Sequence, residues 1–114
     1  MNETGRTAAV DRAALLEVFL IEAQECLLAM KQALGELQAR PQDEGQVQVL
    51  FLMARTIAGS APSLGLQGAA ELAHALQDVV QRVREHSLPV TDVLIALLRR
   101  SVDRLREVLP LMGP

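Results

Sequence analysis

Few side chains in this sequence could hold a metal ion or attack a substrate. The chain has a single cysteine, Cys26, and two histidines, His74 and His86, and their spacing matches no pattern of metal ligands. It also lacks a glycine-rich phosphate loop and a Gly-x-Ser-x-Gly elbow. We therefore expect no metal, no cofactor and no enzymatic active site, and we predict that Cys26 is a small residue of the apolar core.

The composition argues against two classes of partner. The net charge is −3 and the chain has no Trp or Tyr, so it offers neither the basic surface nor the stacking side chains that nucleic-acid binding needs. No run approaches the roughly 18 apolar residues of a membrane helix. The N-terminus has no apolar segment of the secretory kind and a single cysteine forms no internal disulfide, so we expect a cytoplasmic protein without membrane insertion.

Four stretches of the chain carry apolar residues at three- and four-residue spacing, which is typical of helices with one buried face. We expect the helices to run from about Asp11 to Ala39, from the cap residue Asp43 to near Pro62, from Gln67 to His86, and onward from the cap residue Thr91. Asp11 is the expected cap of the first helix. Asp43 with Gln46 resembles a capping box, and Pro62 cannot donate the next helical hydrogen bond.

The apolar stripes of these helices form the predicted core. They are Leu15, Phe19, Ala23, Cys26, Leu27, Met30, Leu34 and Leu37; Val47, Leu50, Phe51, Ala54, Ile57, Ala58 and Ala61; Leu72, Ala73, Leu76, Val79, Val80 and Val83; and Leu94, Leu97, Leu98, Val102, Leu105 and Val108. No stretch alternates with period two, so we expect no strand. Residues 1–10 are predicted to be flexible and residues 11–111 to form one all-α, antiparallel, up-and-down four-helix bundle, a monomer.

The segment ARTIAGSAPSLGL, residues 54–66, resembles the phosphate-accepting segment of bacterial histidine-containing phosphotransfer (HPt) domains, in particular those of chemotaxis-type histidine kinases. That family's motif reads His-Thr-x-Lys-Gly-Ser-Ala, and the same frame runs here from Arg55 to Ala61. Residues 19–30, 71–84 and 90–105 are similar to the family's first, third and fourth helices. The resemblance covers residues 15–109 and implies an HPt-like bundle in a chemotaxis-like, two-component phosphorelay.

The same resemblance implies that the chemistry of the family is lost. Its phosphoacceptor His falls on Arg55 and its motif Lys falls on Ala58. On the third helix the family often shows His-x-x-Glu, and here His74 is retained while the Glu is Gln77. A guanidinium has only donors and stays protonated, so Arg55 offers no lone pair to a phosphoryl group. We therefore expect no phosphate uptake at the usual position.

In that family, the adjoining flanks of the second and third helices form the docking surface for response-regulator receiver domains. The resemblance places Leu52, Arg55 and Gly59 on one flank and Gln77 and Gln81 on the other. We predict that these five residues bind a receiver domain or a histidine kinase. Positions 55, 58 and 77 are all expected to lie on partly exposed flanks.

Three functions stay open at this point. The first is a docking or regulatory module that no longer accepts phosphate. The second is an active phosphocarrier that uses His74, and the third is a structural bundle that dimerises. We favour the first, because an imidazole at position 74 would lack the Lys and Glu partners of the family's acceptor.

Overall fold

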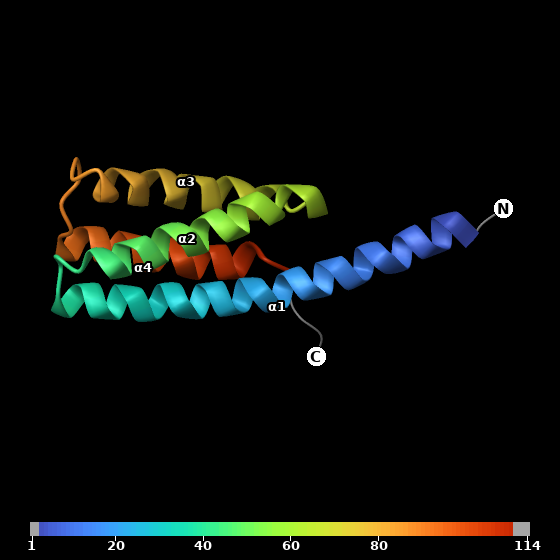
Figure 1. Ribbon diagram of the computed structural model, residues 1–114, viewed down its shortest axis with the longest axis horizontal. Helices are drawn as coiled ribbons and strands as arrows, with labels where there is room; N and C mark the ends of the chain where they lie inside the picture. Colours follow the sequence, from blue (N-terminus) through green and yellow to red (C-terminus); the bar gives the residue numbers. More distant parts are fainter. Residues whose placement is uncertain (1–2, 111–114) are drawn as a thin grey trace.

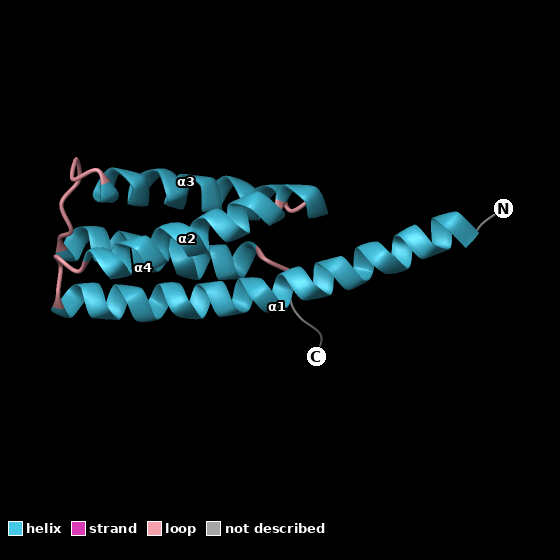
Figure 2. Ribbon diagram, in the orientation of Figure 1, coloured by secondary structure: helices cyan, strands magenta, loops and turns pink. Residues whose placement is uncertain are grey.

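The structure is a computed structural model that describes the backbone of residues 3–110 and the side chains of residues 11–110. Its elements are the helices α1 (Glu3–Ala39), α2 (Glu44–Ser60), α3 (Gln67–Arg84) and α4 (Asp92–Val108), with a 3₁₀ turn, η1 (Pro62–Leu64), between α2 and α3. Successive helices run in opposite directions (Figure 1), and residues 3–110 contain no strand (Figure 2). The prediction of an all-α, antiparallel four-helix bundle is confirmed.

Two of the three predicted helix caps are present. The Asp43 carboxylate accepts a hydrogen bond from the Gln46 amide at 3.3 Å, and the Thr91 hydroxyl accepts one from the Leu94 amide at 3.1 Å. Each cap satisfies an amide that the first turn of its helix would otherwise leave unpaired. The capping box itself is only half formed, because the Asp43 amide donates to the Arg40 carbonyl at 3.1 Å rather than to Gln46.

The predicted start of α1 and the predicted end of α3 differ from the structure, whereas the end of α1 at Ala39 and the start of α3 at Gln67 are as predicted. α1 begins at Glu3, so Asp11 lies inside the helix and does not cap it. No proline stands between these positions, and a helix that has already formed extends at little cost. α3 ends at Arg84 instead of His86, whose φ of 60° lies in the left-handed region and cannot continue a helix. Whether residues 1–10 are flexible stays a prediction.

A tight turn brings α3 back against α2. The Leu66 amide donates to the Ala61 carbonyl at 3.0 Å, and the Gly65 amide donates to the Pro62 carbonyl at 3.1 Å. Gly65 has φ 76°, a left-handed conformation that a side chain would strain. The two helices therefore leave the turn as antiparallel neighbours, as Figure 1 shows.

Side chains from all four helices meet in one core. The largest fully buried ones are Met30, Leu34, Leu37, Ile57, Val80, Val102 and Leu105. Two predicted core residues are wrong, since Leu15 is 61 % exposed and Leu97 is 52 % exposed. On α4 the inward position belongs to Ile95, which is buried. The other predicted stripes face the core, with members such as Phe51 half-buried at its edge.

The helix α1 is apolar on two sides. Its core side packs in the bundle, while Val18, Ile21 and Leu28 are exposed on the other side. In Figure 1 its N-terminal part extends beyond the other helices. A helix with two apolar sides has no single stripe, which explains why spacing alone put Leu15 in the core.

By length and composition, the segment Glu44–Leu64 could cross a membrane. One such segment is weak support for a membrane role, because core helices of soluble proteins pass the same test. Here Val47, Leu50 and Ile57 are buried in the bundle core. The absence of membrane insertion stays a prediction.

The buried thiol of Cys26 gives a first test of the packing. Burial raises the pKa of Cys26, and the Glu22 and Glu25 carboxylates raise it further. Because only the thiolate reacts, we expect a disulfide reagent at pH 8 to label the folded chain at least about tenfold more slowly than the urea-unfolded chain. The rate should rise with pH up to the raised pKa. Equal rates in the two states would contradict this packing.

Candidate functional site

The five predicted docking residues lie on the neighbouring helices α2 and α3, and we call them together the α2–α3 face: Leu52, Arg55, Gly59, Gln77 and Gln81. Leu52 is 40 % exposed, Arg55 and Gly59 are exposed, and the two glutamines are half-buried. The helices that carry them pack against each other, and in Figure 1 they converge towards the turn that joins them. A partner could therefore contact residues of both helices at once.

The helical repeat explains why these side chains point outward. On α2, Ala54, Ile57 and Ala58 fill the core. Residues 52, 55 and 59 follow three- and four-residue steps along an adjacent side. On α3 the buried row contains Ala73, Leu76, Val80 and Val83, and residues 77 and 81 each lie one position further round the helix. The core stripes thus fix the orientation of the α2–α3 face.

Gly59 leaves an open place on this face. A Cβ atom built there meets no other atom within 4 Å. Its backbone does not lie in the left-handed region, where the structure places only Gly65 among the glycines it describes. A larger side chain at position 59 would therefore project into solvent without disturbing the fold.

Ala58 does not lie on a partly exposed flank, and that expectation was wrong. It is only 2 % exposed. The position follows Ile57 directly and lies four residues after Ala54, both fully buried, so it belongs to the core side of α2. Any lysine at position 58 would have to extend along the helix to bring its ammonium to solvent. Arg55 and Gln77, in contrast, are as accessible as expected.

His74 is exposed on α3, one turn before Gln77. None of the hydrogen bonds and ion pairs among residues 11–110 involves its ring. An acceptor imidazole needs a group that fixes its ring and its tautomer. The structure provides no such group at His74.

Two further residues of this region, Arg84 and Phe51, had not been expected at the site. The Arg84 guanidinium lies over the Phe51 ring, with Cζ 4.1 Å from the ring centroid, and its Nη1 donates to Gln81 Oε1 at 2.8 Å. Phe51 and Arg55 are four residues apart, so they are neighbours on α2. The Arg84 side chain therefore crosses from α3 to α2, about one helical turn from Arg55. Spacing on a single helix cannot reveal a contact of this kind.

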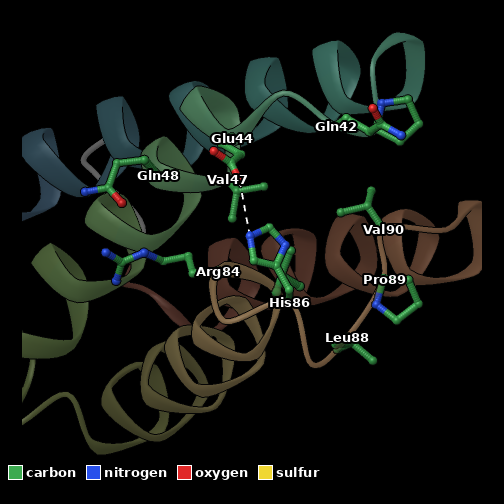
Figure 3. Close-up of a pocket in the computed structure, with 11 residues that line it drawn as sticks. Gln42, Glu44, Val47, Gln48, Arg84, His86, Leu88, Pro89 and Val90 are labelled. Carbon is green, nitrogen blue, oxygen red and sulfur yellow. Dashed lines mark ion pairs between the residues drawn. The ribbon is translucent and has the colours of Figure 1, made fainter.

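A cleft of about 780 Å³ adjoins the face where the α1–α2 and α3–α4 connections meet (Figure 3). Gln48 and Arg84 line it on the side of the face. His86 Nε2 and Glu44 Oε1 approach to 3.2 Å at the cleft, an ion pair when the imidazole is protonated. Among the residues that the structure describes, no three His, Cys, Asp or Glu side chains are placed to hold a metal ion.

Comparison with known proteins identifies the kind of bundle. The model of the Hpt domain family matches residues 14–108. The chain is 34 % identical over 95 residues to the sensor histidine kinase CheAY of Helicobacter pylori, and the aligned region covers 83 % of this chain and 12 % of that protein. It is 30 % identical over 94 residues to the chemotaxis protein CheA of Halobacterium salinarum, covering 82 % of this chain and 14 % of that one.

A solved structure is also similar. The CheA phosphotransferase domain from Thermotoga maritima superposes with a TM-score of 0.76 at 29 % sequence identity, covering 82 % of this chain and 90 % of that domain. The match is therefore to nearly the whole of one domain. In contrast, the chain spans only about an eighth of the length of these two curated relatives.

Proposed function

The chain belongs to the Hpt domain family, and from this premise we propose that it is a docking or regulatory module that cannot accept a phosphoryl group at the family's usual position. The observation that carries the proposal is the exposed Arg55 in the frame of the phosphoacceptor His. Phosphoryl transfer to histidine needs a neutral nitrogen with a free lone pair, and a guanidinium has none.

Two neighbouring substitutions support the same proposal. Ala58, in the frame of the motif Lys, carries no charge to balance a phosphoryl group and is buried. Gln77, in the frame of the orienting Glu, is neutral. Positioning and charge stabilisation account for most of phosphoryl-transfer catalysis. On this proposal, all three positions have lost the residues that act together in phosphoryl transfer.

We propose a receiver domain or a histidine kinase as the partner, bound protein to protein in a chemotaxis-like, two-component pathway. Support comes from the relatives, which are named chemotaxis proteins and a sensor histidine kinase. On this proposal the chain is not itself an enzyme, acts in the cytoplasm as a monomer and binds no nucleic acid. A phosphocarrier based on His74 and a dimerising bundle are the alternatives.

The variant Gly59→Arg tests the docking proposal. Because position 59 opens to solvent on the α2–α3 face, a long charged side chain there should weaken receiver binding at least about tenfold, through steric exclusion at the centre of an interface. The fold should stay intact, since replacing a helical glycine raises helix propensity. Isothermal titration calorimetry with receiver domains of chemotaxis systems measures the effect.

Gly35→Arg provides the matched control. Gly35 lies in α1, is exposed, and a Cβ there also meets nothing within 4 Å. The two variants add the same charge to helical positions on different sides of the bundle. We expect Gly35→Arg to bind as the wild type does. Equal binding by Gly59→Arg and the wild type would show that docking uses another surface.

A further inference from the structure

We infer that Arg55 and Arg84 together form a phosphoryl-binding site, through which the α2–α3 face binds the phosphoryl group of a docked, phosphorylated receiver domain without accepting that group covalently. The identity of the partner rests on the proposed function, whereas the site itself rests on the geometry of the two arginines. No bond forms or breaks in this binding. The phosphoryl group stays on the partner and is held by hydrogen bonds and charge.

The first support is the placement of the two guanidinium groups. The Arg84 group is held over the Phe51 ring and tied to Gln81. Phe51 and Arg55 are neighbours on α2 at four-residue spacing, about 6 Å between their Cβ atoms. Both arginines are exposed. Arg84 therefore reaches α2 at a residue one helical turn from Arg55, on the side of the bundle that a partner would cover.

The second support is the absence of local charge compensation. Neither arginine belongs to an ion pair among residues 11–110. The Glu44 carboxylate, which lines the same cleft as Arg84, lies 3.2 Å from His86 and forms no ion pair with Arg84. The two positive charges repel each other, and a bound anion would relieve that repulsion.

The carboxylates of α3 lie on a different row of that helix. One row of α3 follows seven- and four-residue steps and contains Glu71, Asp78 and Arg82. Another row follows four- and three-residue steps and contains Gln77, Gln81 and Arg84. Adjacent positions of a helix differ by about 100° in direction. Within α3, the row of Gln77, Gln81 and Arg84 thus carries no acidic residue. Glu85 follows Gln81 by four residues, but it lies just beyond the end of α3 and forms no ion pair with either arginine.

The donors suit a phosphoryl group better than a carboxylate. A guanidinium has five N–H donors in a planar fork that fits the oxygens of a phosphate. Arg84 uses one donor for Gln81, and its remaining donors and those of Arg55 are available to an anion at the face. A phosphoryl dianion balances both positive charges and offers three oxygens, whereas a carboxylate balances only one charge.

Methyl phosphate is the direct probe of this site. We would titrate it into the isotopically labelled chain at pH 7.5 and constant ionic strength, and follow the side-chain Nε–H signals of the arginines by NMR. Arg55 and Arg84 should shift together with one dissociation constant, and acetate should bind more weakly. Arg55→Gln and Arg84→Gln should each weaken binding about threefold, as expected for an exposed charge pair. The double variant should weaken it about tenfold.

Arg82→Gln is the matched control, because it removes the same charge from α3 on another side of that helix. It should leave the affinity for methyl phosphate unchanged. If Arg82→Gln weakened binding as much as Arg84→Gln, the effect would be one of net charge and the inference would be overturned. Uniform shifts of all arginine signals would overturn it as well.

A second measurement separates this inference from the proposed function. Receiver domains are titrated with and without beryllofluoride, an analogue of the phosphoryl group. We expect the wild type to bind the receiver domain more tightly with beryllofluoride than without it. The double variant Arg55→Gln with Arg84→Gln should show no such gain in affinity. Equal binding in both conditions would overturn the inference while docking stands. If no receiver bound but methyl phosphate still bound through both arginines, the proposed function would fail while the site stands.

Discussion

Replacing Arg55 by His, Ala58 by Lys and Gln77 by Glu together should produce a phosphoacceptor that a chemotaxis-type kinase labels about 100-fold faster than Arg55→His alone. The single variant would supply the imidazole but neither the group that orients it nor the charge that balances the phosphoryl group. Removing one preorganised electrostatic contact from an active site slows reactions by a factor on the order of 100. Because the three side chains act as a unit, their effects should be far from additive.

The controls follow from the same chemistry. Ala58→Lys with Gln77→Glu, keeping Arg55, should take up no phosphate, and neither should the wild type. Acid-labile, base-stable labelling with radioactive ATP as the phosphoryl source measures the rate per folded molecule. A folded triple variant no faster than Arg55→His would show that these positions do not form one site. Wild-type labelling that disappears in His74→Ala would instead identify His74 as a phosphocarrier.

The buried position of Ala58 changes the design of that experiment. A lysine there replaces a residue that is only 2 % exposed. We expect Ala58→Lys to lower the free energy of unfolding by about 1–3 kcal/mol, through overpacking and partial desolvation of the ammonium. The folded fraction of each variant is therefore measured by circular dichroism before labelling rates are compared.

Ile57→Ala should lower the free energy of unfolding by about 2–5 kcal/mol, the range for removing a large aliphatic side chain from a packed core. Ile57 is fully buried where α2 meets the other helices. Urea denaturation measures the change from the transition midpoint. A loss of this size is a large part of the stability of a domain this small.

Leu52→Ala is its control on the same helix. Leu52 is 40 % exposed on the α2–α3 face, so its replacement should lower stability by less than about 1 kcal/mol. The same variant should weaken receiver binding if the docking face is correctly placed. Similar destabilisation by both substitutions would mean that α2 is oriented differently in the bundle from the structure described here.

Much of the fold was predictable because local chemistry and spacing agree. Asp43 and Thr91 cap helices where the sequence places them, and Pro62 lies in the turn directly after α2. The errors have physical causes. Leu15 and Leu97 share the three- and four-residue spacing of the core residues but lie at the edges of their apolar stripes. Whether a side chain at such an edge is buried depends on where the neighbouring helices pack.

The candidate site was predictable in part. The resemblance to HPt domains assigned Leu52, Arg55 and Gln77 to one face, and the structure leaves all three at least partly exposed on the neighbouring helices α2 and α3. It could not place the Arg84 guanidinium over Phe51, because that contact depends on side-chain conformation between two helices. The burial of Ala58 could have been predicted from the sequence, since the position belongs to the same apolar stripe as Ala54.

The short connections of the bundle have a consequence for its folding rate. Only residues 40–43, 61–66 and 85–91 separate one helix from the next. Contacts between consecutive helices are thus close in sequence, and helical proteins of such low contact order fold in microseconds to milliseconds. The hairpin of α2 and α3, closed by the turn at Gly65, can form before α1 and α4 complete the core. Arg55 and Arg84 would then be in place early, so that the face they form is regained quickly after each transient unfolding.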